Sequence, residues 1–206
     1  MKSAHLLLIF ILSSIGASAQ SSNSFLLNLY GGYTFSDRVD FDVSHATVED
    51  GFEYGAGLEY FFMENSSIEL KYKRLDSNLP VYGLNNEQIN SDDDKSALNY
   101  ILLDYTHYFK LSSDTVMPFL GAGGGLGILE TPQSGNGTYF AWDIKAGVKI
   151  KTNSPLSINL HAYLESMSAA VGNDYYWTYY GLVGVSDYVS TFQFGLGASL
   201  SYDFSK

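Results

Sequence analysis

Apolar and polar residues alternate along most of the chain with a period of two positions. The clearest segment is 192–204, in which apolar side chains occupy every second position and small or polar residues fill the gaps. A period of two places neighbouring side chains on opposite faces of a β-strand. The Gly-rich segment 118–128 alternates less cleanly, but nothing in it suggests a helix. The pattern predicts eight strands, at residues 25–35, 52–62, 68–72, 101–105, 118–128, 140–150, 156–164 and 192–204.

The connections between these segments alternate between short and long. Short turns are expected at 63–66, 110–116 and 151–155, and long polar loops at 36–51, 76–96, 130–137 and 165–187. Short periplasmic turns opposite long extracellular loops are typical of outer-membrane barrels. The sheet must close, because lipid cannot satisfy an open strand edge. We therefore predict an all-β fold, an eight-stranded antiparallel up-and-down transmembrane β-barrel.

A soluble ligand-binding barrel of the lipocalin type also alternates, but its apolar face points inward. The lipocalin-type Gly-x-Trp near the first strand is absent, since the chain has tryptophan only at Trp142 and Trp177. Aromatic residues near strand ends are typical of the interfacial girdles of membrane barrels. The sequence places such residues at Phe25, Phe35, Phe52, Phe62, Phe109, Phe140 and Phe204. This arrangement favours the membrane barrel over the soluble one.

The first residues have the features of a secretory signal peptide. Lys2 precedes an unbroken apolar run at 6–12, and Ala17-Ser18-Ala19 forms an A-x-A cleavage site. The run is shorter than the roughly 18 residues that a transmembrane helix needs. We expect residues 1–19 to be removed on export and residues 20–206 to form the barrel domain.

Charge narrows the function classes. The chain has 11 basic and 22 acidic residues, a formal net charge of −11, whereas a nucleic-acid binder needs a basic face. It has no cysteine, which excludes disulfides and thiolate metal sites. The four predicted long loops hold 14 acidic and two basic residues, so the net charge lies at the loop end. Such loops either bind cations or a basic partner, or simply keep the exposed surface soluble.

The polar face of the strands carries charges of both signs. An eight-stranded barrel is only wide enough for its own side chains to fill. We expect these charges to pair and to plug the lumen, because shielded charges are tolerable only when paired. Around the 63–66 turn we expect the register that places Glu59 beside Lys71, since Glu59 beside Glu69 would bring like charges together. The predicted lumen network is Glu59, Glu69, Lys71, Lys73, Asp104, Asp143, Lys145, Lys149 and Asp203.

Three further motifs suggest weaker candidates. Asp92, Asp93 and Asp94 could bind a divalent cation, although their spacing is not that of an EF-hand and a solvated loop tip explains them. The glycines of 121–127 lack the spacing of a phosphate-binding loop, and they suit a bend or room for a large neighbour. Aromatic residues crowd the last long loop, either as part of a girdle or as a surface-binding patch: Tyr175, Tyr176, Trp177, Tyr179 and Tyr180.

The sequence resembles a known family in three features: the Ala17-Ser18-Ala19 site, the stretch 118–123 (PFLGAG) and the terminal strand 192–204. This is the family of small eight-stranded outer-membrane barrels that includes OmpA-type and OmpX-type barrels and short porin-family proteins. The resemblance implies residence in the outer membrane of a Gram-negative bacterium, contact with lipid and lipopolysaccharide, and insertion by the barrel-assembly machinery. It also implies a monomer without a cofactor.

Enzymes on small barrels of this kind carry recognisable residues. A lipid A deacylase has a His-x-Ser pair, whereas here Thr47, Phe109 and Tyr163 follow two positions after the mature histidines. A palmitoyltransferase needs an N-terminal amphipathic helix, for which the few residues before the first strand leave no room. We therefore expect a non-catalytic outer-membrane barrel with acidic, tyrosine-rich loops for surface structure or binding. A narrow pore for small solutes or ions is the alternative, ahead of a lipid A-modifying enzyme or a lipocalin-like barrel.

Overall fold

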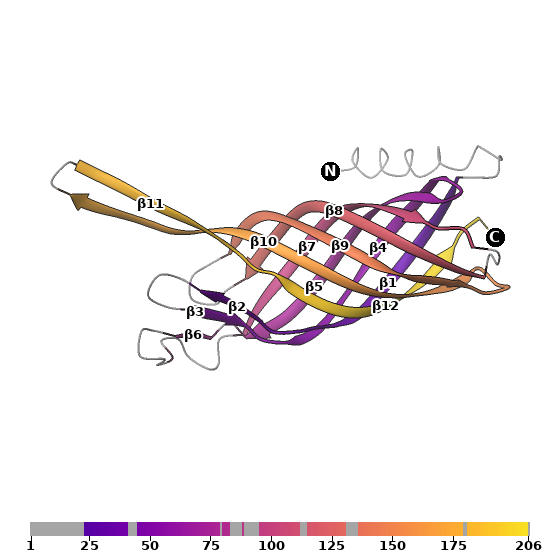
Figure 1. The fold of residues 1–206 in the computed structure, drawn as a ribbon, viewed down its shortest axis with the longest axis horizontal. Helices are drawn as coiled ribbons and strands as arrows, with labels where there is room; N and C mark the ends of the chain where they lie inside the picture. Colours follow the sequence, from indigo (N-terminus) through magenta and orange to yellow (C-terminus); the bar gives the residue numbers. More distant parts are fainter. Residues whose placement is uncertain are drawn as a thin grey trace, which may run out of the picture.

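The computed structural model of the protein describes residues 23–40, 45–78, 80–82, 88, 95–111, 115–130, 136–178 and 181–205. Within 39–46, at 81 and 95, and within 169–189, only the backbone of these residues is described. In these ranges eight antiparallel strands form a barrel (Figure 1). They are β1 (Ser24–Thr34), β4 (Gly51–Met63), β5 (Ser66–Asn78), β7 (Lys95–Tyr108), β8 (Val116–Glu130), β9 (Gly137–Lys151), β10 (Leu156–Thr178) and β12 (Gln193–Asp203).

The barrel closes between its first and last strands. Strands β1, β4, β5, β7, β8 and β9 pair in chain order, and β9 also pairs with β10. Strand β12 then pairs with β10 on one side and with β1 on the other. Every pairing is antiparallel, so the predicted up-and-down barrel is confirmed. Among the described residues, no helix is long and apolar enough to cross a membrane.

Small strands occupy two of the long connections. Strands β2 (Asp37–Asp40) and β3 (His45–Val48) form a hairpin between β1 and β4, and β3 also pairs with β6 (Val81–Tyr82). Figure 1 shows this small sheet at one end of the barrel, which we call the long-loop end. The opposite end, where short turns join the strands, is called the short-turn end.

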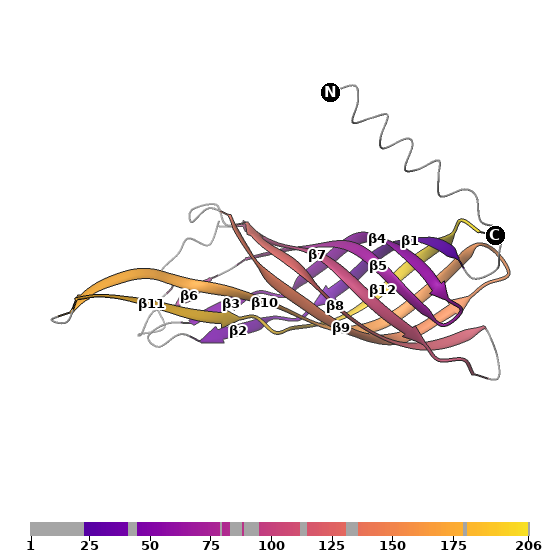
Figure 2. The same cartoon turned by 90° about the horizontal axis from the view of Figure 1, so that it is seen from above.

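The predicted loop at 165–187 is wrong. Strand β10 continues to Thr178 and pairs with β11 (Gly181–Ser190), and Figures 1 and 2 show this hairpin extending far beyond the barrel. The registry shifts between Val171 and Asp174. Outside the bilayer neither face of a ribbon must be apolar, so the strict alternation that identifies a membrane strand ends before the strand does.

The two faces of the barrel wall have opposite polarity. The outward side chains are apolar and exposed, among them Leu29, Leu58, Leu70 and Leu103, and the predicted girdle phenylalanines are exposed with them. The inward side chains are mostly polar and buried. A lipocalin-like barrel would show the reverse, so the apolar wall identifies lipid as the surroundings.

Candidate functional site in the barrel lumen

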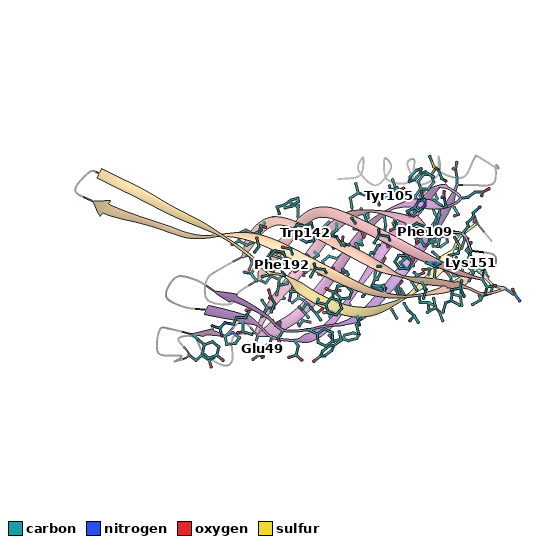
Figure 3. All side chains as sticks on the ribbon, viewed as in Figure 1. Glu49, Tyr105, Phe109, Trp142, Lys151 and Phe192 are labelled. Atoms are coloured by element: carbon teal, nitrogen blue, oxygen red, sulfur yellow. The ribbon has the colours of Figure 1, made fainter. Side chains whose placement is uncertain are left out.

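The lumen is built in three layers. An apolar cluster closes the long-loop end, with Val48 of β3 among its buried members Leu75, Leu98, Tyr100, Leu102, Ala141 and Met167. A second cluster lies toward the short-turn end, where Phe61 packs against the buried Tyr108, Met117 and Phe119. Charged side chains fill the space between them. Figure 3 shows the two ends of the molecule, with Glu49 near the long loops and Lys151 at the short turns.

The central charges form a connected cluster from three strands, β5, β7 and β9. The Lys71 ammonium lies 2.8 Å from Asp104 Oδ2 and also contacts Asp143. The Lys145 ammonium lies 2.8 Å from the same Asp104 oxygen and 2.9 Å from Glu69 Oε2. All five side chains are buried, so each charge depends on these contacts rather than on water.

Toward the long-loop end, a single lysine holds two carboxylates. The Lys73 ammonium lies 2.9 Å from Glu53 Oε1, contacts Glu165 on the far side of the lumen, and sits 4.4 Å from the centre of the Tyr163 ring. Tyr163 in turn shares a 2.9 Å hydrogen bond with Thr34. These contacts join β5 to β4 and β10 across the lumen.

Toward the short-turn end, the carboxylate of Glu59 contacts four other polar side chains. Its Oε1 accepts hydrogen bonds from Ser67 at 2.6 Å and Tyr108 at 2.7 Å. Its Oε2 accepts from Asn28 at 3.2 Å and lies 3.5 Å from the Lys149 ammonium. Glu59 is therefore satisfied largely by neutral donors.

The predicted pairing of Glu59 with Lys71 is wrong, because the register places Glu59 directly opposite Glu69. A bulge between Phe61 and Met63 shifts the strands by one residue near the turn. The two like charges are tolerated because Asn28 donates to both carboxylates and each carboxylate also has donors of its own. Glu69 accepts from Asn28 at 2.6 Å, from Tyr30 and from Lys145. Lys71 itself faces Gly57, where a Cβ would lie 3.1 Å from the Lys71 Cβ.

Eight of the nine predicted network residues are buried on the inner face, and Asp203 is the exception. Asp203 lies at the end of β12, half-buried, and its Oδ1 accepts hydrogen bonds from the backbone N–H and hydroxyl of Ser205. Sequence reasoning did not include Glu53 and Glu165. Both occupy inward positions, Glu53 between Phe52 and Tyr54, so the alternation itself could have identified them.

Two glycines of β8 give room to the charged side chains. Gly121 and Gly123 point inward, and a Cβ on Gly123 would lie 2.0 Å from Asp104 Oδ1 and 2.7 Å from Asp143 Oδ1. On Gly121 it would lie 2.8 Å from Thr106 Oγ1 and 2.9 Å from Lys145 Cε. The expectation that these glycines accommodate large neighbours is confirmed.

The remaining candidates give no assembled site. Asp92, Asp93, Asp94, Tyr179 and Tyr180 lie outside the described residues, and Tyr175, Tyr176 and Trp177 belong to the part of β10 described by backbone alone. In the ranges that the structure covers, no group of three or more histidine or acidic side chains could hold a metal ion.

One serine–histidine pair lies on the barrel wall. Ser66 and His107 are register partners on β5 and β7, and Ser66 Oγ lies 3.1 Å from His107 Nδ1 and 3.2 Å from the Tyr105 hydroxyl. Ser66 is buried beneath these rings, so a substrate cannot reach its hydroxyl. The contact joins neighbouring strands and does not supply an accessible nucleophile.

Pockets open at both ends of the barrel. A pocket of about 300 Å³ at the short-turn end is lined by three members of the second apolar cluster, Phe61, Tyr108 and Met117, and by Lys149. Glu64, Lys110, Lys151 and Asp203 also line it. There a hydrogen bond from Lys110 lowers the pKa of the Glu64 carboxyl. A groove of about 710 Å³ at the long-loop end is lined by Glu49, Asp50, Asp76, Glu130 and Arg74, among others.

A closed barrel with an apolar wall and a polar, filled lumen defines the class of outer-membrane β-barrels. Residues 6–187 match the family model described as "OprF membrane domain", and the chain belongs to this family. No curated protein sequence matches the chain.

Solved structures that share the fold include three outer-membrane proteins. The outer membrane protein OprG from Pseudomonas aeruginosa is 12% identical, with a TM-score of 0.57 over 89% of this chain and 96% of that one. Neisserial surface protein A (NspA) is 13% identical, with a TM-score of 0.54 over 85% and 95%. The outer membrane protein AlkL, determined in lipid bilayers, is 12% identical, with a TM-score of 0.51 over 92% and 94%. At these identities the likeness concerns the fold alone.

Proposed function

We propose that residues 1–19 are removed on export and that residues 20–206 form a non-catalytic, monomeric barrel in the outer membrane, inserted by the barrel-assembly machinery and surrounded by lipid and lipopolysaccharide. The barrel acts as a rigid support for the structures at its long-loop end. The observation that carries this proposal is the lumen, in which paired charges lie between two apolar clusters. A lumen filled in this way serves stability better than passage.

The central cavity supports a plug. It measures about 10 Å³ and is lined by Asn28, Tyr30, Glu59, Glu69 and Lys145, among others. Such a volume holds about one water molecule. A continuous file of water, which ion conduction needs, would require the apolar clusters at the two ends to open.

Conductance in planar bilayers tests the plug. We expect the refolded protein to show little or no steady current. The same sample, run unboiled and boiled on a denaturing gel, should show the faster mobility of a folded barrel when unboiled, which separates a closed lumen from a failure to fold. A large and stable current would overturn the plug and favour the narrow pore. Because the described lumen holds six carboxylates and four lysines, such a pore would select cations.

We further propose a surface role for the hairpin of β10 and β11. It extends beyond the barrel from the long-loop end (Figure 2), and its sequence carries Tyr175, Tyr176 and Trp177, residue types that dominate binding hot spots. Neisserial surface protein A, which shares the fold, is named for a surface location.

Protease treatment of intact cells tests this orientation. Proteinase K should cut the hairpin within 171–187 and leave a protected barrel fragment, because the hairpin faces the exterior. A variant in which a two-residue Asn-Gly turn replaces 171–187 should fold and lose that cleavage. Cleavage only after the cells are lysed would overturn the proposed orientation.

A further inference from the structure

We propose that the pocket at the short-turn end binds a small amphipathic carboxylate, with the carboxylate on Lys149 and the apolar part against Phe61, Tyr108 and Met117. This proposal concerns the opposite end of the barrel from the surface role and does not depend on it. It rests on the contacts of one buried lysine and on the shape and chemistry of the space beside it.

Lys149 differs from the other three lysines of the lumen. Each of Lys71, Lys73 and Lys145 contacts two carboxylates, at 2.9 Å or less. Among the described residues, the Lys149 ammonium meets one carboxylate, that of Glu59, at 3.5 Å. Lys149 is nevertheless as deeply buried as Lys71. Its charge is therefore the least neutralised of the four.

Glu59 cannot supply the missing contact without losing others. Its Oε1 is taken by Ser67 and Tyr108, and its Oε2 also accepts from Asn28. An ammonium group has three N–H donors, and Glu59 offers Lys149 one long contact. Lys149 also lines the pocket, and we infer that a second acceptor comes from that side.

The surroundings of Lys149 hold the ammonium in place and are apolar. The ammonium lies 5.1 Å from the ring centres of both Phe61 and Tyr108, within the range of cation–π attraction. The pocket of about 300 Å³ is lined on its apolar side by Leu26, Phe61, Tyr108, Met117 and Leu156. Glu64, Lys110, Lys151 and Asp203 also line the pocket, but Lys149 is the charged residue that is buried against its apolar wall. An apolar wall with a few polar groups is the usual form of a small-ligand site, and this volume is at the lower end of the range.

The charge of the ligand follows from these contacts. A cation would be repelled by Lys149, and a neutral apolar molecule would leave its ammonium unsatisfied. The chain as a whole is strongly acidic, so an anion would not be drawn to it at long range. Binding must therefore come from local contact with the lysines of the pocket, of which Lys149 is the buried one, and a short acyl chain would cover the rings around it.

The methionines provide the readout. The mature chain would contain Met63, Met117 and Met167; the first two line the pocket, and Met167 belongs to the apolar cluster at the other end. We would label the methionine methyl groups with ¹³C and titrate the barrel with octanoate in a non-ionic detergent. The Met117 methyl signal should shift and saturate, whereas the Met167 signal should stay in place.

Two control ligands distinguish the contribution of the carboxylate from that of the apolar chain. Octanol has the same chain without the carboxylate, and octylammonium carries the opposite charge. We expect octanol to bind at least tenfold more weakly than octanoate and octylammonium not to bind. Equal affinity for octanol and octanoate, or joint movement of the Met117 and Met167 signals, would overturn the proposal, since either result would mean general partition into an apolar surface.

Variants test the role of Lys149 directly. Lys149→Gln should weaken octanoate at least tenfold and leave octanol unchanged, whereas Lys149→Arg should retain octanoate binding. Lys110→Gln, at the exposed rim of the same pocket, is the matched control and should change the affinity less than twofold. The gel mobility of unboiled samples shows which variants fold. If Lys149→Gln does not fold, the affinities of Lys149→Arg for octanoate and octanol test the site instead, and equal affinities would refute it. Unchanged octanoate affinity in a folded Lys149→Gln barrel would refute the site.

Discussion

The inner and outer faces of the barrel wall are made by the same strands but obey different rules. Leu103 and Asp104 are neighbours on β7, and their exposed fractions are 58% and 1%. On the outer face a side chain meets lipid, so it needs only to be apolar. On the inner face a side chain meets particular partners, so its charge, length and neighbours all matter.

This difference gives the two faces different tolerance to substitution. An outer residue can be exchanged for another apolar one with little loss, because lipid adapts to its shape. An inner residue such as Asp104 is shared by Lys71 and Lys145, and removing one member leaves another uncompensated. The following changes test this contrast, from the largest expected effect to the smallest.

Lys71→Met should have the largest effect. It leaves the buried Asp143 without its ammonium and Asp104 with Lys145 alone. Breaking a buried ion pair in this way costs about 3–5 kcal/mol. Urea unfolding in phosphatidylcholine vesicles, followed by tryptophan fluorescence, would measure the loss. Adding Asp143→Asn should recover part of it, because the stranded charge is then removed; a double variant no more stable than the single one would contradict the pairing.

Leu103→Lys places a charge on the outer face in the middle of β7. A lysine near the bilayer midplane of a barrel costs about 2–4 kcal/mol. Leu103→Ile is the matched control and should change the unfolding free energy little, because the surface stays apolar. If the lysine variant were as stable as the isoleucine variant in the same vesicles, this face would not be in lipid.

Gly123→Ala adds one methyl group to the inner face, and Gly124→Ala adds one to the outer face. The added methyl at 123 would meet Asp104 Oδ1 at 2.0 Å, whereas at 124 its nearest neighbours are 3.9 Å away. Overpacking costs about 1–3 kcal/mol, so Gly123→Ala should lower the urea midpoint and Gly124→Ala should leave it nearly unchanged. Equal effects of the two variants would mean that the inner wall has spare room.

Shortening the segment 87–94 should have the smallest effect. This segment belongs to a long connection between β5 and β7, and exposed loops tolerate change. The shortened protein should keep the mobility difference between unboiled and boiled samples and fractionate with outer membranes. Failure to assemble would show that the segment takes part in the barrel.

The sequence predicted the parts of the fold that depend on one strand at a time. The alternation of Leu103 with Asp104, and of Ile144 with Asp143 and Lys145, was enough to assign side chains to faces. It did not reveal the hairpin of β10 and β11, because a ribbon outside the bilayer is not constrained to alternate. It also gave the wrong partner for Glu59, because Lys71 and Glu69 share a face of β5 and alternation cannot distinguish two registers that differ by two residues.

By itself, the sequence determined that this chain forms strands, which residues of each strand share a face, and that the buried face carries charges of both signs. The tertiary structure decided which charges meet. Lys71 contacts Asp143 and Lys73 contacts Glu165, from strands that are distant in sequence and face each other across the lumen. Such contacts depend on the register and closure of the whole barrel, and no periodicity within a single strand contains that information.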